Sequence, residues 1–286
     1  MSHLSVEITR RCNLKCAHCC RGDTQNVDID YKYIDLLLDQ VDYIYHLTFT
    51  GGEPTLNVPA IQYFIDQCKE KNVKVDYVSI ITNGIRIKQD FIDVCIDLHT
   101  STRGTDVWVS TDEYHSSQKK ADISLLQKMP FYKGPKIRNG TILSEGRGRY
   151  LPESASHGAK GAAFTYTTHF TDKGHYFMLN ALGEMISNID TSYDRQNQFK
   201  MCDVKDLIRF YTFLELKQMT DNKFVEEDWE RIPYTDKMYL YEREREIWEE
   251  YQEWMDRQDR LPAEINIIIP DSLEYDRKRQ KVNRES

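Results

Sequence analysis

Three cysteines near the N-terminus have the spacing of metal ligands. Cys12, Cys16 and Cys19 follow one another as C-x3-C-x2-C within RRCNLKCAHCCRGD, the stretch at 10–23 that also contains His18. Four of the seven cysteines of the chain lie in this stretch. An odd, clustered set of cysteines, without the even spacing of a disulfide framework, indicates a metal site or a catalytic thiol.

The number of ligands favours an iron–sulfur cluster over zinc. A structural zinc site takes four ligands, usually from two separated cysteine pairs, and the second pair is missing in this sequence. Three thiolates on one short loop suit a [4Fe–4S] cube in which three irons are bound to protein and the fourth keeps an exchangeable position. The spacing therefore predicts a cluster on this loop.

The elements around the loop alternate between strands and helices. Apolar patterning predicts strands at 4–9, 46–50, 75–82 and 106–111, and helices at 31–44, 58–72 and 88–98. This alternation calls for βα units with a parallel sheet, so the expected fold class is α/β. The cysteine loop follows the first strand, which places it at the carboxyl edge of the sheet, where α/β folds hold their ligands.

A glycine-rich stretch ends the second predicted strand. In LTFTGGEP (47–54), Gly51 and Gly52 lack a Cβ, so the backbone can turn sharply and approach a ligand. Glu53 adds an anionic partner for a cationic group. EITRRCNLKCAHC resembles the cluster loop of the radical S-adenosylmethionine (radical SAM) superfamily, and LTFTGGEP resembles the glycine-rich motif of the same superfamily.

The resemblance implies two cofactors and a radical reaction. The [4Fe–4S] cluster would be held by Cys12, Cys16 and Cys19, and S-adenosylmethionine would bind its open iron. In this family the reduced cluster cleaves S-adenosylmethionine, and the 5′-deoxyadenosyl radical so formed abstracts a hydrogen atom from the substrate. The electron would come from a flavodoxin- or ferredoxin-type donor. The resemblance assigns the S-adenosylmethionine pocket to Gly51, Gly52, Glu53, Asn83, Ser110, Asp112 and Arg147.

Several neighbouring residues have a second interpretation. Arg147, in ILSEGRGR (142–149), would pair with the S-adenosylmethionine carboxylate or lie on a charged surface loop. His18 is expected to pack against cluster or adenine, and Cys20 is expected to be a bystander because a direct neighbour of Cys19 cannot readily bind the same cube. The remaining cysteines are not expected to bind a cluster; they are Cys68, Cys95 and Cys202.

The chain is expected to divide into three regions. Residues 1–150 would form a partial TIM-like (β/α) barrel, since only about thirty residues separate STDEYH from EGRG, too few for two complete βα units. Residues 151–202 resemble a degenerate SPASM or twitch extension, a β-hairpin region without the cysteines of an auxiliary cluster. Residues 203–286 would form helices, at 204–219 and 237–257, and a frayed basic tail.

Composition narrows the functional classes. A net charge of −8 argues against bulk nucleic-acid binding, and no apolar stretch is long enough for a signal peptide or a membrane span, so a cytoplasmic enzyme is expected. The main hypothesis is a radical SAM enzyme that modifies a peptide or protein. The alternatives are a small-molecule or nucleotide substrate, favoured because the barrel would begin almost at Met1 without a peptide-recognition domain, and a non-catalytic iron–sulfur or zinc module.

Overall fold

A single large sheet organises the chain. The structure is a computed structural model that describes residues 1, 3–116, 121–136, 142–152, 154–155, 176–186, 190–220 and 249–257. The sheet has eight strands in the order β10-β9-β8-β1-β2-β3-β4-β5, and β6 and β7 form a separate two-stranded sheet. The strands are β1 (His3–Thr9), β2 (Tyr43–Gly51), β3 (Lys74–Thr82), β4 (Gly104–Ser110), β5 (Tyr132–Lys136), β6 (Ile142–Leu143), β7 (Ser154–Ala155), β8 (Tyr176–Leu179), β9 (Glu184–Ile186) and β10 (Lys200–Asp203).

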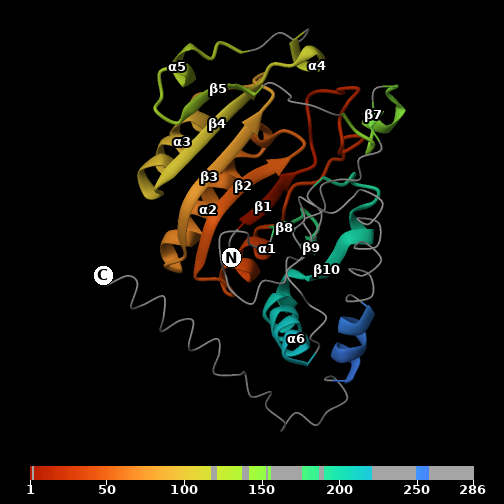
Figure 1. Ribbon diagram of the computed structural model, residues 1–286. Helices are drawn as coiled ribbons and strands as arrows, with labels where there is room; N and C mark the ends of the chain where they lie inside the picture. The colour runs from red at the N-terminus through yellow and green to blue at the C-terminus, as the bar shows by residue number, and fades with distance from the viewer. Residues whose placement is uncertain are drawn as a thin grey trace.

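Helices connect the parallel strands. Strands β8, β1, β2, β3, β4 and β5 run parallel to one another, whereas β9 is antiparallel to both of its neighbours, β8 and β10. The α/β class and the partial-barrel arrangement are therefore confirmed, and the sheet stays open between β5 and β10 in the described part of the chain (Figure 1). The helices are α1 (Tyr31–Leu38), α2 (Val58–Glu70), α3 (Gln89–Ser101), α4 (Glu113–Ser116), α5 (Ser124–Gln127) and α6 (Leu207–Thr220), with 3-10 turns η1 (Pro54–Leu56), η2 (Gly148–Tyr150), η3 (Gln196–Phe199) and η4 (Val204–Asp206).

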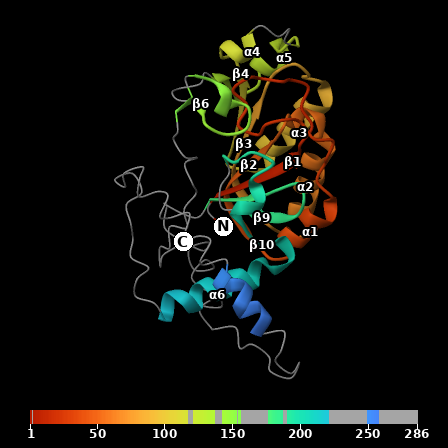
Figure 2. The ribbon, with the colours of Figure 1, turned by 90° about the vertical axis from the view of Figure 1, so that its right-hand side faces the viewer.

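One face of the sheet is packed under helices. Figure 2 shows α1, α2 and α3 together on one side of the strands. The register aligns Val6, Phe49, Ile80 and Val107 across four strands, and each is at most 1% exposed. Since successive strand residues point to opposite faces, these apolar positions form the core beneath the helices.

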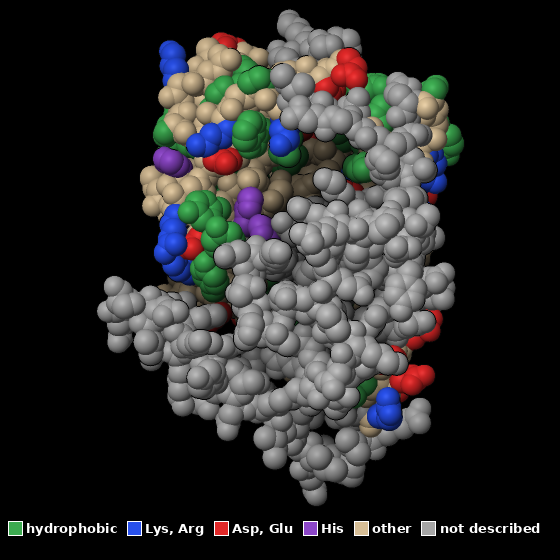
Figure 3. Space-filling view, in the orientation of Figure 1, with side chains coloured by type: hydrophobic (Ala, Val, Ile, Leu, Met, Phe, Trp, Pro, Cys, Tyr) green, Lys and Arg blue, Asp and Glu red, His purple; other side chains and the backbone are tan. Residues whose placement is uncertain are grey.

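Four polar side chains line up on the opposite face, and three of them are only half-buried. The register aligns Ser5, Thr48, Ser79 and Asp106 on this side. Figure 3, which looks onto this side, shows a hollow over the strands next to a group of histidine side chains. Among the described residues, this face therefore offers hydrogen-bonding side chains beside the carboxyl edge.

Two elements differ from expectation. The first helix, predicted to reach residue 44, ends at Leu38, because the N–H of Asp39 closes it on Asp35 and the chain turns into β2 at Tyr43. The hairpin predicted at 175–189 is present as β8 and β9, but β8 also pairs in parallel with β1. The predicted boundary at residue 150 therefore does not separate two sheets, although the division into domains stays a prediction.

The described C-terminal residues form helical layers. The helix predicted at 204–219 is present as η4 and α6. Residues 249–257 are helical, and Tyr251, 2% exposed, packs its ring on Phe210 and Phe213. Most of the predicted stripe at 237–257 and the basic tail lie outside the described residues. Within the described ranges, no helix is long and apolar enough to cross a membrane.

The helix-covered core yields a stability prediction. Phe49→Ala should lower the free energy of unfolding by about 3–5 kcal/mol, because the ring is 1% exposed and contacts Phe64 edge-on. Ile96→Ala on α3, where the side chain is 40% exposed, should change it by less than about 1 kcal/mol. Urea denaturation followed by circular dichroism measures both, and equal losses would contradict the assigned core face.

Candidate functional site

The cysteine loop leaves the sheet at the end of β1. The Cys12, Cys16 and Cys19 side chains are half-buried, whereas Cys68, Cys95 and Cys202 lie in the core, as expected for small buried side chains. The N–H of Cys19 donates to the carbonyl of Cys16 at 3.2 Å, and the N–H of Cys12 donates to Oγ1 of Thr24 at 2.9 Å. The first three thiols therefore sit on a folded loop with access to solvent.

The three thiols influence one another electrostatically. Burial raises the pKa of Cys16 to about 11, and the charges of Cys19 and Cys12 add to this rise, while Arg147 opposes it. The pKa of Cys12 is also raised, first by burial, with smaller contributions from Glu53 and Cys19. A positive charge near Cys12 and Cys16, such as a bound metal supplies, favours their thiolate forms.

The spacing of the thiols suits a cluster better than one ion. Among the described residues, the group of three potential ligands whose donor atoms lie within 4.8 Å of one another consists of His18, Asp112 and His115. The three cysteine sulfur atoms do not form such a close group. Two thiolates on a single tetrahedral zinc ion would lie about 3.8 Å apart, given Zn–S bonds near 2.3 Å. The residues present therefore fit a wider, multi-iron cluster held by the three cysteines.

The glycine motif supports the loop from behind. The N–H of Gly52 donates to the carbonyl of Thr9 at 2.8 Å, and the N–H of Glu53 donates to that of Arg11 at 2.9 Å. Gly51 has φ +143°, and a Cβ there would lie 2.0 Å from the Thr9 oxygen. A Cβ on Gly52 would lie 2.3 Å from the Arg11 oxygen. The glycines thus permit backbone contact with the start of the cysteine loop.

Glu53 has a structural task in this arrangement. It is 1% exposed, and its carboxylate accepts hydrogen bonds from Thr55, from Oγ1 of Thr82 at 2.6 Å and from the N–H of Asn83 at 2.8 Å. Burial raises its pKa, and these hydrogen bonds partly offset the rise. The carboxylate fixes the ends of β2 and β3 relative to each other, and its predicted contact with S-adenosylmethionine stays a prediction.

Asn83 and Ser110 lie at the same edge. The side-chain amide of Asn83 donates to Oδ1 of Asn13 at 2.7 Å, so it reaches the cysteine loop directly. Ser110 is the last residue of β4 and is half-buried. The sequence-based assignment of both residues to one edge agrees with these positions, while their contacts with a cofactor remain predictions.

Asp112 belongs to a compact polar group with two histidines. Its Oδ1 lies 2.7 Å from Nδ1 of His115 and accepts the N–H of Tyr114 at 3.0 Å. Burial acts to raise its pKa, but the hydrogen bond from His115 and the charges of His115 and His18 bring the pKa below its ordinary value. The His18 ring packs on Tyr114 with 4.5 Å between ring centroids. An ionised Asp112 thus faces the side of the cysteine loop.

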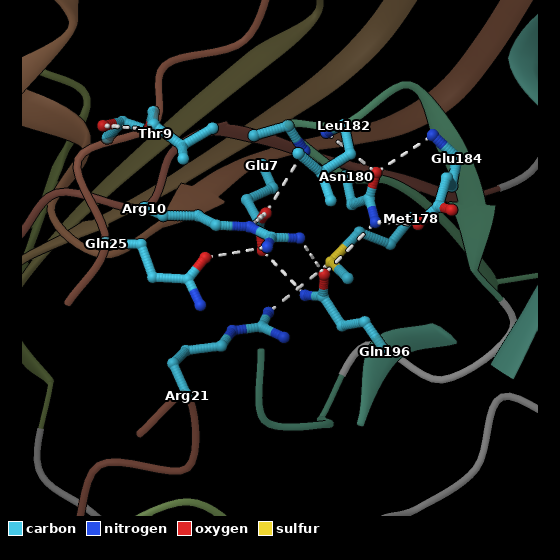
Figure 4. Close-up of polar contacts among 12 residues, drawn as sticks. Glu7, Thr9, Arg10, Arg21, Gln25, Met178, Asn180, Leu182, Glu184 and Gln196 are labelled. Carbon is cyan, nitrogen blue, oxygen red and sulfur yellow. Dashed lines mark hydrogen bonds and ion pairs between the residues drawn. The ribbon is translucent and has the colours of Figure 1, made fainter. Parts of the chain in front are cut away.

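A buried ion pair anchors the first residue of the loop. Nε of Arg10 donates to Oε1 of Glu7 at 2.6 Å, and both side chains are at most 4% exposed (Figure 4). Gln196 joins the pair from η3, donating to Glu7 at 2.8 Å and accepting from Arg10. Figure 4 also shows Arg21, which donates to the carbonyl of Thr191 at 2.9 Å and contacts the Met178 sulfur. The second half of the chain therefore holds both ends of the cysteine loop.

Sequence patterns did not single out several of these residues. Glu7 and Arg10 lie within EITRRCNLKCAHC, but no role was assigned to them there, and Thr24 and Gln196 lie outside the quoted motifs. His115 had a local signal, since it follows Asp112 by three residues, the spacing of neighbours on one helical turn. Arg147 lies against the loop, and its guanidinium donates to the carbonyl groups of Cys16 and Gly22, while its predicted pairing with the S-adenosylmethionine carboxylate stays a prediction.

Comparison with known sequences identifies the first part of the chain. The radical SAM superfamily matches residues 6–116. The chain contains a radical SAM domain. This confirms the predicted superfamily for residues 6–116, and with it the [4Fe–4S] cluster and S-adenosylmethionine as the cofactors of an enzyme domain of that class.

Two curated proteins resemble parts of this chain. Uncharacterized protein MJ0907 of Methanocaldococcus jannaschii is 38% identical over 95 residues, which are 31% of this chain and 32% of that protein. The antilisterial bacteriocin subtilosin biosynthesis protein AlbA of Bacillus subtilis is 29% identical over 120 residues, 40% of this chain and 25% of AlbA. The chain thus spans about a third and a quarter of the lengths of these relatives.

Two solved structures have distant similarity. Native anSMEcpe with bound AdoMet and the Cp18Cys peptide has a TM-score of 0.46 at 13% identity, covering 73% of this chain and 79% of that one. Streptococcus suis SuiB bound to the precursor peptide SuiA has a TM-score of 0.34 at 12% identity, covering 66% of this chain and 59% of that one.

The close approach of the glycine motif to the cysteine loop can be tested. Gly52→Ala should displace the loop, because the new Cβ would overlap the Arg11 carbonyl, and should cost about 1–3 kcal/mol of stability. Gly104→Ala is the matched control, since its Cβ would meet only the partly exposed ring of Tyr77. Iron bound after anaerobic reconstitution is the readout; wild-type iron in both variants would contradict this packing.

The anchoring pair gives a second prediction at the site. Glu7→Ala should cost about 3–5 kcal/mol of unfolding free energy, because it leaves the Arg10 guanidinium buried without its counter-charge. Asp39→Ala removes the pair with Lys71 at the surface and should cost less than about 1 kcal/mol. Chemical denaturation distinguishes the two variants. Similar costs would mean that the buried pair does not support the loop.

Proposed function

We propose that this radical SAM chain cleaves S-adenosylmethionine reductively and removes a hydrogen atom from a peptide or protein substrate. The observation that carries the proposal is the set of three half-buried thiols, Cys12, Cys16 and Cys19, on one loop at the carboxyl edge of the sheet. When bound, the cluster and S-adenosylmethionine supply a carbon radical strong enough to take that hydrogen. A flavodoxin- or ferredoxin-type donor is the partner that would provide the electron.

The protein residues bind and orient in this reaction. The three cysteines hold the cluster, and the backbone of residues 51–53 keeps their loop at a constant distance from β2. Asp112, ionised and fixed by His115, supplies a hydrogen-bond acceptor for a ribose hydroxyl or an ammonium group. Since the Glu53 carboxylate is enclosed, its part is to keep the pocket walls in place.

The polar sheet face opposite the helices is the proposed substrate site. It lies beside the cysteine loop and carries half-buried side chains that include Ser79 and Asp106, which offer hydrogen-bonding groups to a polypeptide. Similarity to AlbA, a bacteriocin biosynthesis protein, over 120 residues adds support for a peptide substrate. A small molecule or a nucleotide would occupy less of this face than a polypeptide would.

Cysteine substitutions test the cluster assignment. Cys12→Ala, Cys16→Ala and Cys19→Ala should each abolish the cluster, because a cube held by three thiolates loses its attachment with any one of them. Cys20→Ala, Cys68→Ala and Cys202→Ala should keep wild-type iron. Iron and sulfide analysis after anaerobic reconstitution measures this. A fall to about half in Cys202→Ala would reveal a second cluster and contradict the assignment of a single cluster to the three cysteines.

The reaction itself is tested by product analysis. The reconstituted protein, reduced with dithionite and supplied with S-adenosylmethionine, should release 5′-deoxyadenosine and methionine, detected by mass spectrometry. The Cys16→Ala protein should release neither. Iron binding with intact S-adenosylmethionine, both alone and with candidate peptides, would instead support a non-catalytic iron–sulfur module.

A further inference from the structure

A short segment that follows β6 packs against the cysteine loop. This segment, residues 145–149 with the sequence EGRGR, is called the clamp segment. The N–H of Arg147 donates to the carbonyl of Cys19 at 2.9 Å, and its Nε donates to the carbonyl of Cys16 at 2.9 Å. Its Nη1 donates to the carbonyl of Gly22 and to Oδ1 of Asp23. One residue thus bonds the loop at four points.

At Gly146, the residue before Arg147, the backbone of the clamp segment directly contacts the backbone of the cysteine loop. Gly146 has φ +52°, and a Cβ there would lie 2.4 Å from the Gly22 nitrogen and 2.5 Å from the carbonyl oxygens of Cys19 and Cys20. No side chain can be accommodated at this position without moving the loop. The backbone packing at Gly146 therefore places Arg147 against the loop.

The other end of the clamp segment is tied to the second half of the chain. The Glu145 carboxylate accepts the N–H and the hydroxyl of Ser192 and pairs with Arg195. Arg149 donates to Oγ of Ser192 at 3.2 Å and lies 3.7 Å from Asp194. Its guanidinium is thus directed at residues 190–199, whereas that of Arg147 is directed at the cysteine loop.

The Arg147 charge is held near the thiols and is only weakly neutralised. Its guanidinium acts electrostatically on Cys12 and Cys16. The acidic partner Asp23 is 91% exposed, so solvent screens its charge, while the Arg147 side chain is only 22% exposed. A planar guanidinium fixed by several carbonyl groups keeps its positive charge in one place.

We propose that Arg147 is a positioning residue that holds the cysteine loop in its cluster-binding shape and raises the reduction potential of the bound cluster. This rests on the proposed function, which supplies the cluster. Reduction adds one negative charge, and a fixed positive charge nearby stabilises the reduced form. Removing that charge should lower the equilibrium constant for reduction of the cluster about tenfold. For a one-electron couple this corresponds to a midpoint potential that is roughly 59 mV more negative. Nε and Nη1 of the guanidinium are bonded to the loop, and the predicted pairing of Arg147 with the S-adenosylmethionine carboxylate stays a prediction.

Arginine variants of the full chain separate these effects. Arg147→Gln removes the charge, Arg147→Lys keeps the charge but not the planar fork, and Arg149→Gln is the matched control two residues away. Each protein is reconstituted anaerobically, checked for folding by circular dichroism, analysed for iron and sulfide, and titrated potentiometrically by electron paramagnetic resonance of the reduced cluster.

The expected result is a lower iron content in Arg147→Gln and a more negative midpoint potential in the fraction that holds a cluster. Arg147→Lys should have a potential nearer to that of the wild type, and Arg149→Gln should match the wild type in both. Complete loss of iron in folded Arg147→Gln, with wild-type iron in Arg149→Gln, would also support the proposal. Wild-type iron and potential in Arg147→Gln, or equal changes in Arg149→Gln, would overturn it.

The same measurements separate this inference from the proposed function. A wild-type protein that binds no cluster would overturn both. A wild-type cluster with cleavage of S-adenosylmethionine, unchanged by Arg147→Gln, would overturn the inference alone. If Arg147→Gln fails to fold, Arg147→Lys decides: a wild-type iron content in a folded Arg147→Lys protein, without the planar fork, would overturn the positioning role.

Discussion

The buried ion pair of Glu7 and Arg10 is the constraint on which the rest of the structure depends. Removing two opposite charges from water is costly unless their remaining hydrogen-bonding groups are satisfied, and in this pair Gln25, Gln196 and the N–H of Ala181 satisfy them. These partners come from the cysteine loop, from η3 and from the turn between β8 and β9. One pair at the end of the first strand thereby joins segments that are far apart in the chain.

The cysteine loop is held mostly through its own backbone. Carbonyl groups of Thr9, Arg11, Cys16 and Cys19 accept hydrogen bonds from the glycine motif and from Arg147, so the loop keeps its shape without a helix or strand of its own. The cysteine side chains take no part in these contacts, although the Cys12 sulfur accepts the N–H of Leu14 at 3.4 Å within the loop, so the thiols remain available as ligands. A preorganised loop loses less conformational freedom when it binds a metal cluster.

The local elements could be predicted from sequence, and the long-range contacts could not. The strand expected at 75–82 is β3 (Lys74–Thr82), and the helix expected at 58–72 is α2 (Val58–Glu70), because hydrophobic period reports burial of one face. The pairing of β8 with β1 has no such signal, since a four-residue strand does not specify its neighbour. The role of Arg147 was equally hidden: its acceptors are mostly carbonyl groups, which every residue possesses.

The central position of β1 has a consequence for synthesis of the chain. β1 lies between β2 and β8, so one of its edges is completed only by residues 176–179. A ribosome adds about 5–20 residues per second, so this edge of β1 stays unpaired for on the order of ten seconds or more after β1 is synthesised. An unpaired edge strand of a parallel sheet recruits other strands during that interval. The unpaired edge of β1 is therefore an aggregation hazard until β8 has been synthesised.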